Sequence, residues 1–389
     1  MNFQNTEIAY KLKSNRQLLK TLLIFRLISS SRLVSVFKKI VTWSLKLNLP
    51  ILGILDKTVF NQFCAGIDEK DSIQIVKKLK KLNVNSYVHY ASEGIESEKD
   101  FDINFKIIIN TINVTKKNPE LPFTVFKASS LGKFNLFEKK SAGSTLSELE
   151  EQSWNKTINR IKSCCKHAAS QNVRIFIDAE ESWIQPVIDE IAESLMEKLN
   201  QEKVIIFTTL QMYRKDRLKY LNEIIQNSIK KKYKLGFKLV RGAYMEKENE
   251  RAYKNGLPSP IFESKIQTDL SFNSALDVIL QKIEQCDLFV GTHCEKSIKK
   301  ILKWMKEKKI PNGYSKIWFS QLFGMADHIS FNLAFQGYQV VKYVPYGPIK
   351  EVVPYLIRRA EENTSVNSQL SKEIYLLKKE MKRRKFIAI

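Results

Sequence analysis

The sequence predicts an α/β protein built on a distorted (β/α)8 barrel of the TIM type, preceded by a helical arm. From residue 84 onward, eight short runs rich in Val, Ile, Phe and Thr recur, and each is followed by a longer amphipathic stretch. A doubly wound sheet is the competing architecture, but the chain contains neither GxGxxG nor GxxxxGK[ST], the glycine-rich turns that usually mark it. The length of 389 residues accommodates a barrel of about 250 residues together with further helices.

The runs place the expected strands at residues 84–90, 122–129, 173–180, 204–211, 236–243, 288–293, 316–322 and 338–345. Expected helices lie at 146–170, 185–199, 215–232, 265–284, 297–309 and 349–363. The organisation that follows is a helical N-terminal arm over 1–83, the barrel over 84–364 and a basic C-terminal tail over 365–389.

The composition excludes several classes of protein. Apolar residues make up 43% and charged residues 27%, so the chain is not disordered or collagen-like. The net charge of +23 is mostly Lys spread over helix-like stretches, with +8 in residues 1–50 and +5 in 365–389. No zinc-finger, homeodomain or RNP pattern accompanies it, so we expect a Lys-rich solvated surface and no nucleic-acid partner. The five cysteines form no CxxC, so we expect no metal site, no disulfide framework and a reducing compartment.

The basic N-terminal region contains no expected membrane span. Lys20, Arg26, Arg32 and Lys46 interrupt its apolar stretches, so none reaches the roughly 18 residues that a span needs. The region also lacks the order of a secretory signal, and we interpret it as part of the mature protein. Residues 18–49 alternate apolar with Lys or Arg, which suits either an interfacial helix or packing on the barrel. The sequence leaves both open.

Polar side chains recur at the carboxyl ends of the expected strands, which is the functional face of such a barrel. Singly, an Asp after a strand is more often a helix cap and a lone His more often structural. Together, they indicate the mouth of an enzyme. They are Glu93, Lys127, Asp178, Gln211, Lys238, Arg241, Thr292, His293 and Tyr343.

The helix expected after the last strand carries an unusual charged face. Tyr355, Arg358, Arg359 and Glu362 are spaced by three and four residues, so they share one side of the helix. Two adjacent guanidinium groups suit a ligand carboxylate or phosphate, with Glu362 holding the pair in place. A surface helix with ordinary ion pairs is the alternative, and the neighbouring tyrosines favour a small ring as ligand.

Six motifs, in order, resemble those of the FAD-dependent proline dehydrogenase (proline oxidase) family, in its monofunctional bacterial form. The resemblance spans roughly residues 63–365. The motifs are Ile177-Asp178-Ala179-Glu180-Glu181, Leu210-Gln211-Met-Tyr-Arg-Lys-Asp, Phe237-Lys238-Leu-Val-Arg241-Gly242-Ala243-Tyr244, Gly291-Thr292-His293, Ser320-Gln321-Leu322-Phe323-Gly324-Met325 and the Arg-Arg helix.

The resemblance implies a function and a set of roles. Such enzymes bind FAD, oxidise L-proline to Δ1-pyrroline-5-carboxylate by hydride transfer to flavin N5, and pass electrons to a membrane quinone. It implies a cytoplasmic enzyme, peripheral on the inner face of the cell membrane, with possible contact with anionic lipid. The implied substrate residues are Lys127, Leu322, Tyr343, Tyr355, Arg358 and Arg359, with Asp178 and Lys238 as catalytic residues. The implied cofactor residues are Ala179, Gln211, Lys238, Arg241, Gly242, Ala243, Thr292 and His293, and Glu93 and Glu362 would support the arginines.

One departure and two alternatives remain. Many bacterial members carry Arg where this chain has Lys238 and Lys where it has Arg241, so a point-like ammonium stands near N5 in place of a planar fork. A related flavoenzyme acting on hydroxyproline is one alternative, although Tyr343 at the distal part of the ring suits proline. A basic membrane- or nucleic-acid-binding protein with an inactive barrel is the other, motivated by the charged ends.

Overall fold

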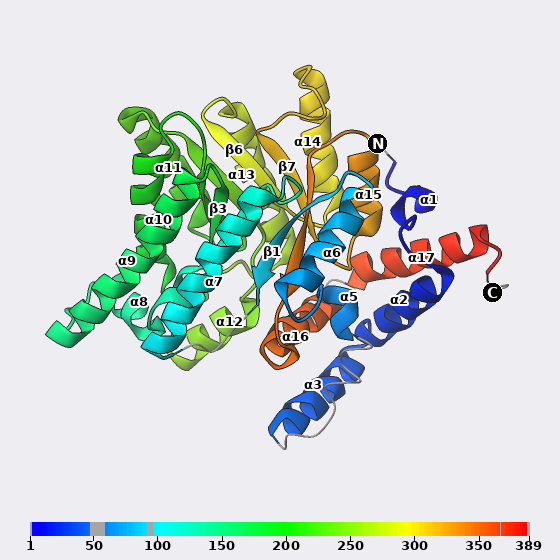
Figure 1. The fold of residues 1–389 in the computed structure, drawn as a ribbon, viewed down its shortest axis with the longest axis horizontal. Coiled ribbons are helices and arrows are strands. Elements are labelled where there is room, and N and C mark those ends of the chain that lie inside the picture. Colours follow the sequence, from blue (N-terminus) through cyan, green and yellow to red (C-terminus); the bar gives the residue numbers. More distant parts are fainter. Residues whose placement is uncertain (1, 47–58, 92–95, 366, 387–389) are drawn as a thin grey trace. The chain divides into compact units, whose positions relative to one another are not determined.

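The computed structural model describes residues 2–46, 59–91, 96–365 and 367–386 (Figure 1). Eight parallel strands form a nearly closed barrel in the order β1-β8-β7-β6-β5-β4-β3-β2, and each is followed by at least one helix. The predicted (β/α)8 fold is therefore confirmed. The strands are β1 (Asn85–Tyr90), β2 (Phe123–Lys127), β3 (Arg174–Asp178), β4 (Ile206–Gln211), β5 (Leu235–Val240), β6 (Cys286–Gly291), β7 (Ile317–Leu322) and β8 (Val340–Tyr346).

Helices precede, link and follow the strands. Those of the N-terminal arm are α1 (Thr6–Ala9), α2 (Asn15–Ile28), α3 (Ser31–Lys46), α5 (Asn61–Phe63) and α6 (Glu69–Lys80). Those between the strands are α7 (Glu98–Lys117), η2 (Ala128–Leu131), α8 (Phe134–Ser141), α9 (Glu148–Ser170), α10 (Gln185–Leu199), α11 (Arg217–Lys231), α12 (Met245–Lys254), α13 (Lys265–Gln281), α14 (Glu295–Glu307) and α15 (Asp327–Phe335). After β8 come α16 (Ile349–Ser365) and α17 (Asn367–Arg383), so part of the stretch expected as a basic tail is helical.

The chain forms two compact units. One combines Met1–Glu93 with Ser320–Ile389, and the other is Gly94–Phe319. We describe each by itself, as the first and the second unit.

The core of the second unit is aromatic. Phe123 stacks on Phe176 with ring centroids 4.8 Å apart and meets Phe207, Phe289 and Trp318 edge-on. All six residues of β4 are buried, as expected for a parallel strand covered on both faces. Local sequence sets the helix starts around this core. Ser147 and Ser264 each begin a helix with a capping box, closed by Glu150 and Gln267 respectively.

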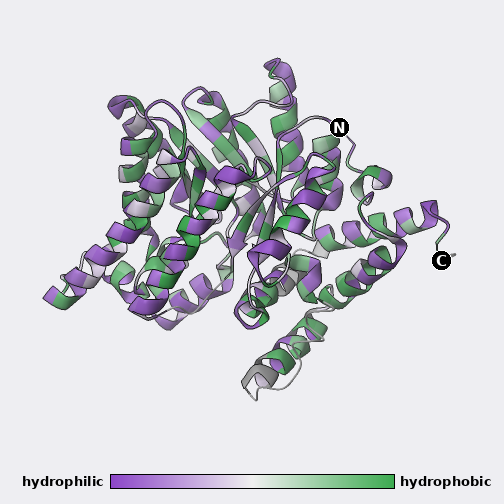
Figure 2. Ribbon diagram, viewed as in Figure 1, coloured by the Kyte–Doolittle hydropathy of each residue, from purple (hydrophilic) through white to green (hydrophobic). Residues whose placement is uncertain are grey.

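The core of the first unit joins the N-terminal arm to the last two helices. Leu18, Leu22 and Phe25 on α2 belong to one buried cluster with Leu376 and Met381 on α17. Both helices present a hydrophobic and a hydrophilic side (Figure 2). Burial of that apolar surface explains why a Lys-rich C-terminal segment folds as a helix.

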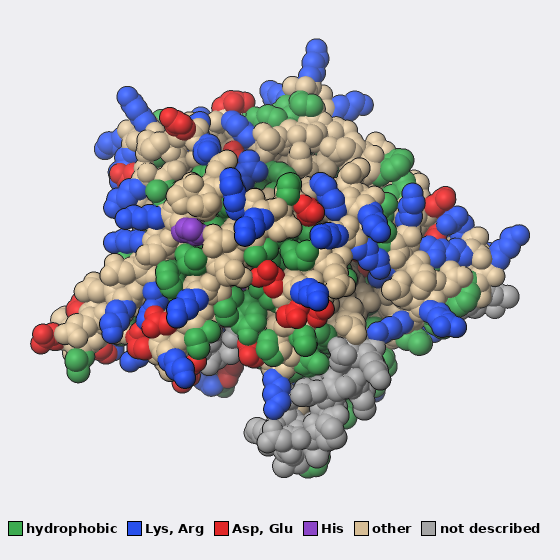
Figure 3. Space-filling model, viewed as in Figure 1, with side chains coloured by type: hydrophobic (Ala, Val, Ile, Leu, Met, Phe, Trp, Pro, Cys, Tyr) green, Lys and Arg blue, Asp and Glu red, His purple; other side chains and the backbone are tan. Residues whose placement is uncertain are grey.

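Lys and Arg side chains are spread over the surface rather than gathered in one groove on the face shown in Figure 3. Among the described residues, no helix is both long and apolar enough to cross a bilayer.

Candidate active site

Lys238 on β5 and Asp178 on β3 meet toward the carboxyl ends of the two strands that flank β4 in the second unit. The Lys238 ammonium donates to Asp178 Oδ1 over 2.5 Å, and the Thr209 hydroxyl donates to the same oxygen over 3.3 Å. The two charged side chains are 9% and 17% exposed, so the pair is largely shielded from solvent. Register explains the meeting, because Lys127 pairs with Asp178 and Thr209 with Lys238 across the sheet. These strands therefore place a predicted substrate residue, a predicted catalytic residue and the predicted N5 contact at one level of the barrel.

Glu180 is a buried acid that the sequence interpretation did not include among the site residues. Its carboxylate accepts hydrogen bonds from the backbone N–H of Ser129 over 2.9 Å and from the Ser129 hydroxyl. Burial raises the pKa of Glu180 to about 7, although the charge of Lys127 opposes the rise. A carboxyl that titrates near neutrality therefore stands beside a predicted substrate-binding cation.

Gln211 links two of the motifs. Its amide Nε2 donates to the backbone carbonyl of Glu180 over 2.7 Å, and its Oε1 accepts from the backbone N–H of Ala243 over 3.1 Å. The side chain is 2% exposed. The amide thus fixes the segment after β3 against the segment after β5, which are predicted to contribute Ala179 and Ala243 to the cofactor site.

Arg241 is held from three directions after β5. Its guanidinium donates to Asp269 on α13 over 2.7 Å, to the Thr292 hydroxyl over 2.6 Å and to the Ser297 hydroxyl over 3.1 Å. The guanidinium also lies 4.3 Å from the centroid of the Phe272 ring. Each terminal nitrogen keeps a second N–H beyond these bonds, so the group can be positioned by protein and still donate to an anion.

Gly242 follows in a backbone conformation that favours glycine, with φ of 143°. A Cβ at this position would lie 2.4 Å from the Tyr213 ring. The backbone of Tyr213 also donates to the Arg241 carbonyl over 2.7 Å. The turn at Gly242 is therefore compact because Tyr213 packs directly against it.

Cys294 follows the predicted cofactor residues Thr292 and His293. Burial would raise the pKa of its thiol, but hydrogen bonding at Ser297 and the charge of Arg241 hold that pKa below its usual value. His293 is half-buried and Thr292 is buried. The positive field at this strand end therefore extends from Arg241 to the start of α14.

The predicted ring-binding tyrosines lie together in the first unit. The Tyr343 hydroxyl on β8 is 2.7 Å from Nδ1 of His89 on β1. Its ring lies 5.9 Å from that of Tyr355 on α16 and 5.2 Å from that of Tyr87. The two tyrosines thus form an aromatic wall whose orientation is fixed by β1.

The two arginines of α16 are half-buried. The Arg359 guanidinium lies 5.4 Å from the centroid of the Tyr355 ring, so a cation and an aromatic wall share one side of the helix as predicted. Glu362 lies on the same helix, but its side chain falls outside the described residues, as does Glu93 after β1.

The loop that carries Leu322 is fixed by buried polar contacts. The Lys342 ammonium is fully buried and donates to the Leu322 carbonyl over 3.2 Å, to the Met325 carbonyl and to Asp327 over 3.0 Å. Burial lowers the pKa of Lys342, while the charges of Lys342 and Lys13 hold that of Asp327 below its usual range despite its burial. The buried ammonium therefore ties the loop around Leu322 to β8.

The helical arm contacts the same loop. The Gln62 amide donates to the Gly324 carbonyl over 2.6 Å and accepts from the Thr21 hydroxyl of α2 over 3.0 Å. Gly324 has φ of 77°, and a Cβ there would lie 1.8 Å from the backbone carbonyl oxygen of Gln62. The arm before the barrel therefore shapes a loop predicted to touch the substrate.

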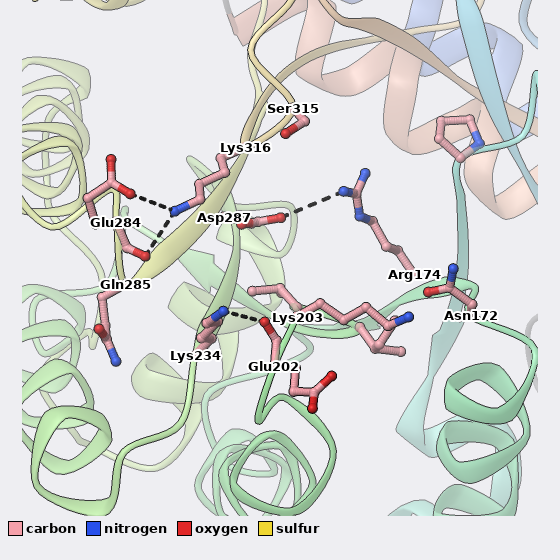
Figure 4. A pocket seen from close by; sticks show the side chains of 13 residues that line it. Asn172, Arg174, Glu202, Lys203, Lys234, Glu284, Gln285, Asp287, Ser315 and Lys316 are labelled. Carbon is pink, nitrogen blue, oxygen red and sulfur yellow. Dashed lines mark hydrogen bonds and ion pairs between the residues drawn. The ribbon is translucent and has the colours of Figure 1, made fainter.

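A cavity of about 460 Å³ lies elsewhere, at the amino-terminal ends of strands of the second unit (Figure 4). Arg174 and Asp287 face it and pair over 3.9 Å, and Lys316 donates to the carbonyl and carboxylate of Glu284. None of the predicted site residues lines this cavity. Because enzymes of this fold act at the carboxyl ends of the strands, we do not assign the candidate site to it.

The structure thus brings the predicted residues together in two groups, one in each unit. Several residues that contact them were not predicted as site residues, and five of these carry polar groups on which the site depends: Glu180, His89, Asp269, Ser297 and Lys342. Two of these carried a signal in the sequence, since Glu180 lies within a motif and Lys342 interrupts an apolar strand. The others depend on contacts between distant segments.

Comparisons with known proteins identify a family and several relatives. Residues 72–372 match the family described as proline dehydrogenase. A carbapenem antibiotics biosynthesis protein, CarD, from Pectobacterium carotovorum is 34% identical over 79% of this chain and 79% of its own length. Proline dehydrogenase 1, mitochondrial, from Dictyostelium discoideum is 33% identical over 98% of this chain and 75% of its own length.

A hydroxyproline dehydrogenase from Xenopus laevis is 31% identical over 97% of this chain and 89% of its own length. Among solved structures, proline utilization A from Bdellovibrio bacteriovorus, inactivated by N-propargylglycine, superimposes with a TM-score of 0.71 at 18% identity. The match covers 92% of this chain and 38% of that longer chain, and at this identity it supports the fold.

Proposed function

Because the chain belongs to the proline dehydrogenase family, an oxidoreductase family, we propose that it oxidises L-proline to Δ1-pyrroline-5-carboxylate with FAD as cofactor. The observation that carries the proposal is the tyrosine–arginine face of α16, where Tyr355 and Arg359 pack cation against ring beside Tyr343. A small ring bearing a carboxylate has the chemistry that this face recognises.

The donor set of the second unit fits FAD. Lys238 and Arg241 provide positive charge at the strand ends, and Gln211 supplies a buried amide between the two motif segments. When bound, FAD supplies the two-electron acceptor for the hydride that leaves the substrate. Lys238, Arg241, Thr292 and His293, together with the Gly242–Ala243 backbone, would hold the isoalloxazine, ribityl and pyrophosphate parts.

The protein's own residues then position the substrate. Arg358 and Arg359, with Lys127, would fix the proline carboxylate, while Tyr343, Tyr355 and Leu322 enclose the ring. The product has its new C=N bond on the side of the nitrogen away from the carboxylate, so a clamp on the carboxylate orients the carbon that loses hydride. Asp178 and Lys238 form a fixed charged pair at the predicted N5 contact. Its role is electrostatic preorganisation.

A matched pair of arginine variants tests the clamp. Arg359→Met should raise the KM for L-proline by about a hundredfold, since a charged hydrogen-bond partner of a buried carboxylate contributes about 3 kcal/mol. Arg16→Met, at an exposed position on α2, should leave the KM unchanged. An unchanged KM in Arg359→Met would contradict the clamp.

Hydroxyproline is the second candidate substrate, because one relative is named a hydroxyproline dehydrogenase. The bond between the Tyr343 hydroxyl and His89 favours proline, since that hydroxyl already has a partner within the protein. The ratio of kcat/KM for L-proline to that for trans-4-hydroxy-L-proline distinguishes the two. We expect a ratio well above one, and a ratio below one would transfer the assignment to hydroxyproline.

The electron acceptor in this proposal is a membrane quinone, which places the enzyme peripherally on the inner face of the cell membrane, in contact with anionic lipid. The basic arm supports this placement, since residues 15–46 contain no acidic residue. Proline-dependent reduction of a short-chain quinone, compared with a soluble dye, tests the acceptor. Reduction of the dye alone would contradict the assignment of a quinone.

A further inference from the structure

Helix α3 has two apolar sides, and one of them faces solvent. On the buried side, Val41 is 1% exposed and packs against Val353 of α16, with Phe37 against the same cluster. The second side consists of four residues spaced three, four and three apart, which line up on one face of a helix. These four define the α3 stripe: Leu33, Val36, Ile40 and Trp43, exposed by 49%, 53%, 50% and 63%.

The helix before it adds to the exposed apolar surface. Leu23 and Leu27 of α2 lie one turn apart and are 50% and 56% exposed. Single exposed apolar residues are ordinary on protein surfaces, but a run of six on consecutive helices that ends in a Trp indicates an interaction surface. The hydrophobic residues run along both helices in Figure 2.

Basic residues border the stripe. Arg32 and Lys39 are exposed, and on the helical wheel both fall next to Trp43 and Val36. Arg26 is exposed between the two leucines of α2. With no acid between residues 15 and 46, the two helices combine aliphatic side chains, an exposed Trp and positive charge. Nucleic acid would use the cations but not a row of Leu, Val and Ile, so this combination matches a lipid surface.

We propose that the α3 stripe is a lipid-contacting surface, by which α3 lies in the headgroup region of an anionic bilayer with Leu33, Val36, Ile40 and Trp43 toward the acyl chains. The proposal rests on the proposed function for its purpose, since an enzyme that reduces a quinone gains from lying on the membrane. The physical argument for binding depends only on the residues of α2 and α3.

The test uses two double variants with the same spacing. Val36→Glu with Ile40→Glu places two acids on the α3 stripe. Ile266→Glu with Leu270→Glu places two acids on α13, where the native side chains are 72% and 62% exposed. The full-length protein with FAD is sedimented with vesicles of phosphatidylcholine and phosphatidylglycerol, and with vesicles of phosphatidylcholine alone.

We expect the native protein and the α13 variant to bind the anionic vesicles alike, and the α3 variant to bind at least about tenfold more weakly. Activity with a soluble dye acceptor should be equal in all three proteins, which shows that the α3 variant is folded. Trp43 should shift its fluorescence to shorter wavelength with anionic vesicles, and Trp43→Phe should remove that shift.

Equal vesicle binding by the α3 variant and the native protein would overturn the proposal. So would a native protein that ignores vesicles but forms a dimer that the α3 substitutions dissociate, because the stripe would then be covered by a second copy. A protein that binds vesicles through the stripe but does not oxidise L-proline would contradict the proposed function and leave this surface assignment intact.

Discussion

Glu180 gives the most quantitative prediction of the structure. Its carboxyl is buried beside Ser129, and its pKa is raised from 4.5 to about 7. In the unfolded chain the group titrates near the lower value, so between pH 4.5 and pH 7 the unfolded state loses its proton while the folded state keeps it. Stability from this group is therefore fully present below about pH 4.5 and is lost as the pH rises through about 7.

The size of the effect follows from the gap between the two pKa values. A difference of about 2.5 units at about 1.4 kcal/mol per unit gives roughly 3 to 4 kcal/mol of unfolding free energy over the whole titration. Glu180→Gln keeps the shape and removes the titration. The unfolded state has already lost most of this proton at pH 5, so relative to the native protein the variant should gain roughly 2 to 3 kcal/mol between pH 5 and pH 8.

Urea unfolding of the FAD-free protein at pH 5 and pH 8 measures this difference. Glu190→Gln on α10, where the side chain is exposed, is the matched control and should follow the native protein within about 0.5 kcal/mol at both pH values. If the native protein and Glu180→Gln lose stability in parallel from pH 5 to pH 8, the buried acid does not titrate as the structure indicates.

Three further substitutions have defined outcomes. Lys342→Met leaves the buried Asp327 carboxylate without its 3.0 Å partner. The free energy of unfolding, measured by urea titration, should therefore fall by about 3 kcal/mol. A loss below about 1 kcal/mol would mean that the pair is not buried as described. Gly242→Ala places a Cβ against the Tyr213 ring at a φ of 143°. The purified variant should therefore contain much less FAD than the native protein, as measured by absorbance. An FAD content equal to that of the native protein would contradict this turn geometry. Asp269→Asn removes the negative charge that accepts from Arg241 Nε. The dissociation constant of FAD, measured by titration, should therefore rise by about fivefold. An unaltered constant would show that the other partners of Arg241 are sufficient to position it.

The sequence predicted the architecture well because the spacing of apolar residues follows directly from which side chains are buried. Each of the eight expected strands overlaps an observed one, and the helix over 185–199 has the observed bounds. The expected strand over 236–243 extends three residues beyond β5, because Arg241 to Ala243 turn away at the Gly242 backbone. Apolar runs mark a strand, but its end depends on the backbone of single residues.

Contacts between side chains were harder to predict. Lys238 and Asp178 were both expected near the flavin, but their 2.5 Å pair joins residues 60 positions apart and depends on strand register. Two of the partners of Arg241 come from α13 and α14, whose rotation about their axes no local pattern specifies. For residues 18–49, the sequence left an interfacial helix and packing on the barrel open. Helix α3 packs against α16 on one side and exposes apolar residues on another. The functional assignment of the site residues stays a prediction.

The visible spectrum of the purified protein with FAD, before and after L-proline is added without oxygen, tests the central claim most directly. The account predicts a bound flavin whose absorbance bleaches with L-proline, and no bleaching at the same L-proline concentration in Arg358→Met with FAD still bound. A flavin that L-proline leaves oxidised would contradict the assigned substrate. A protein that binds no FAD would contradict the cofactor site formed by Gln211, Lys238 and Arg241.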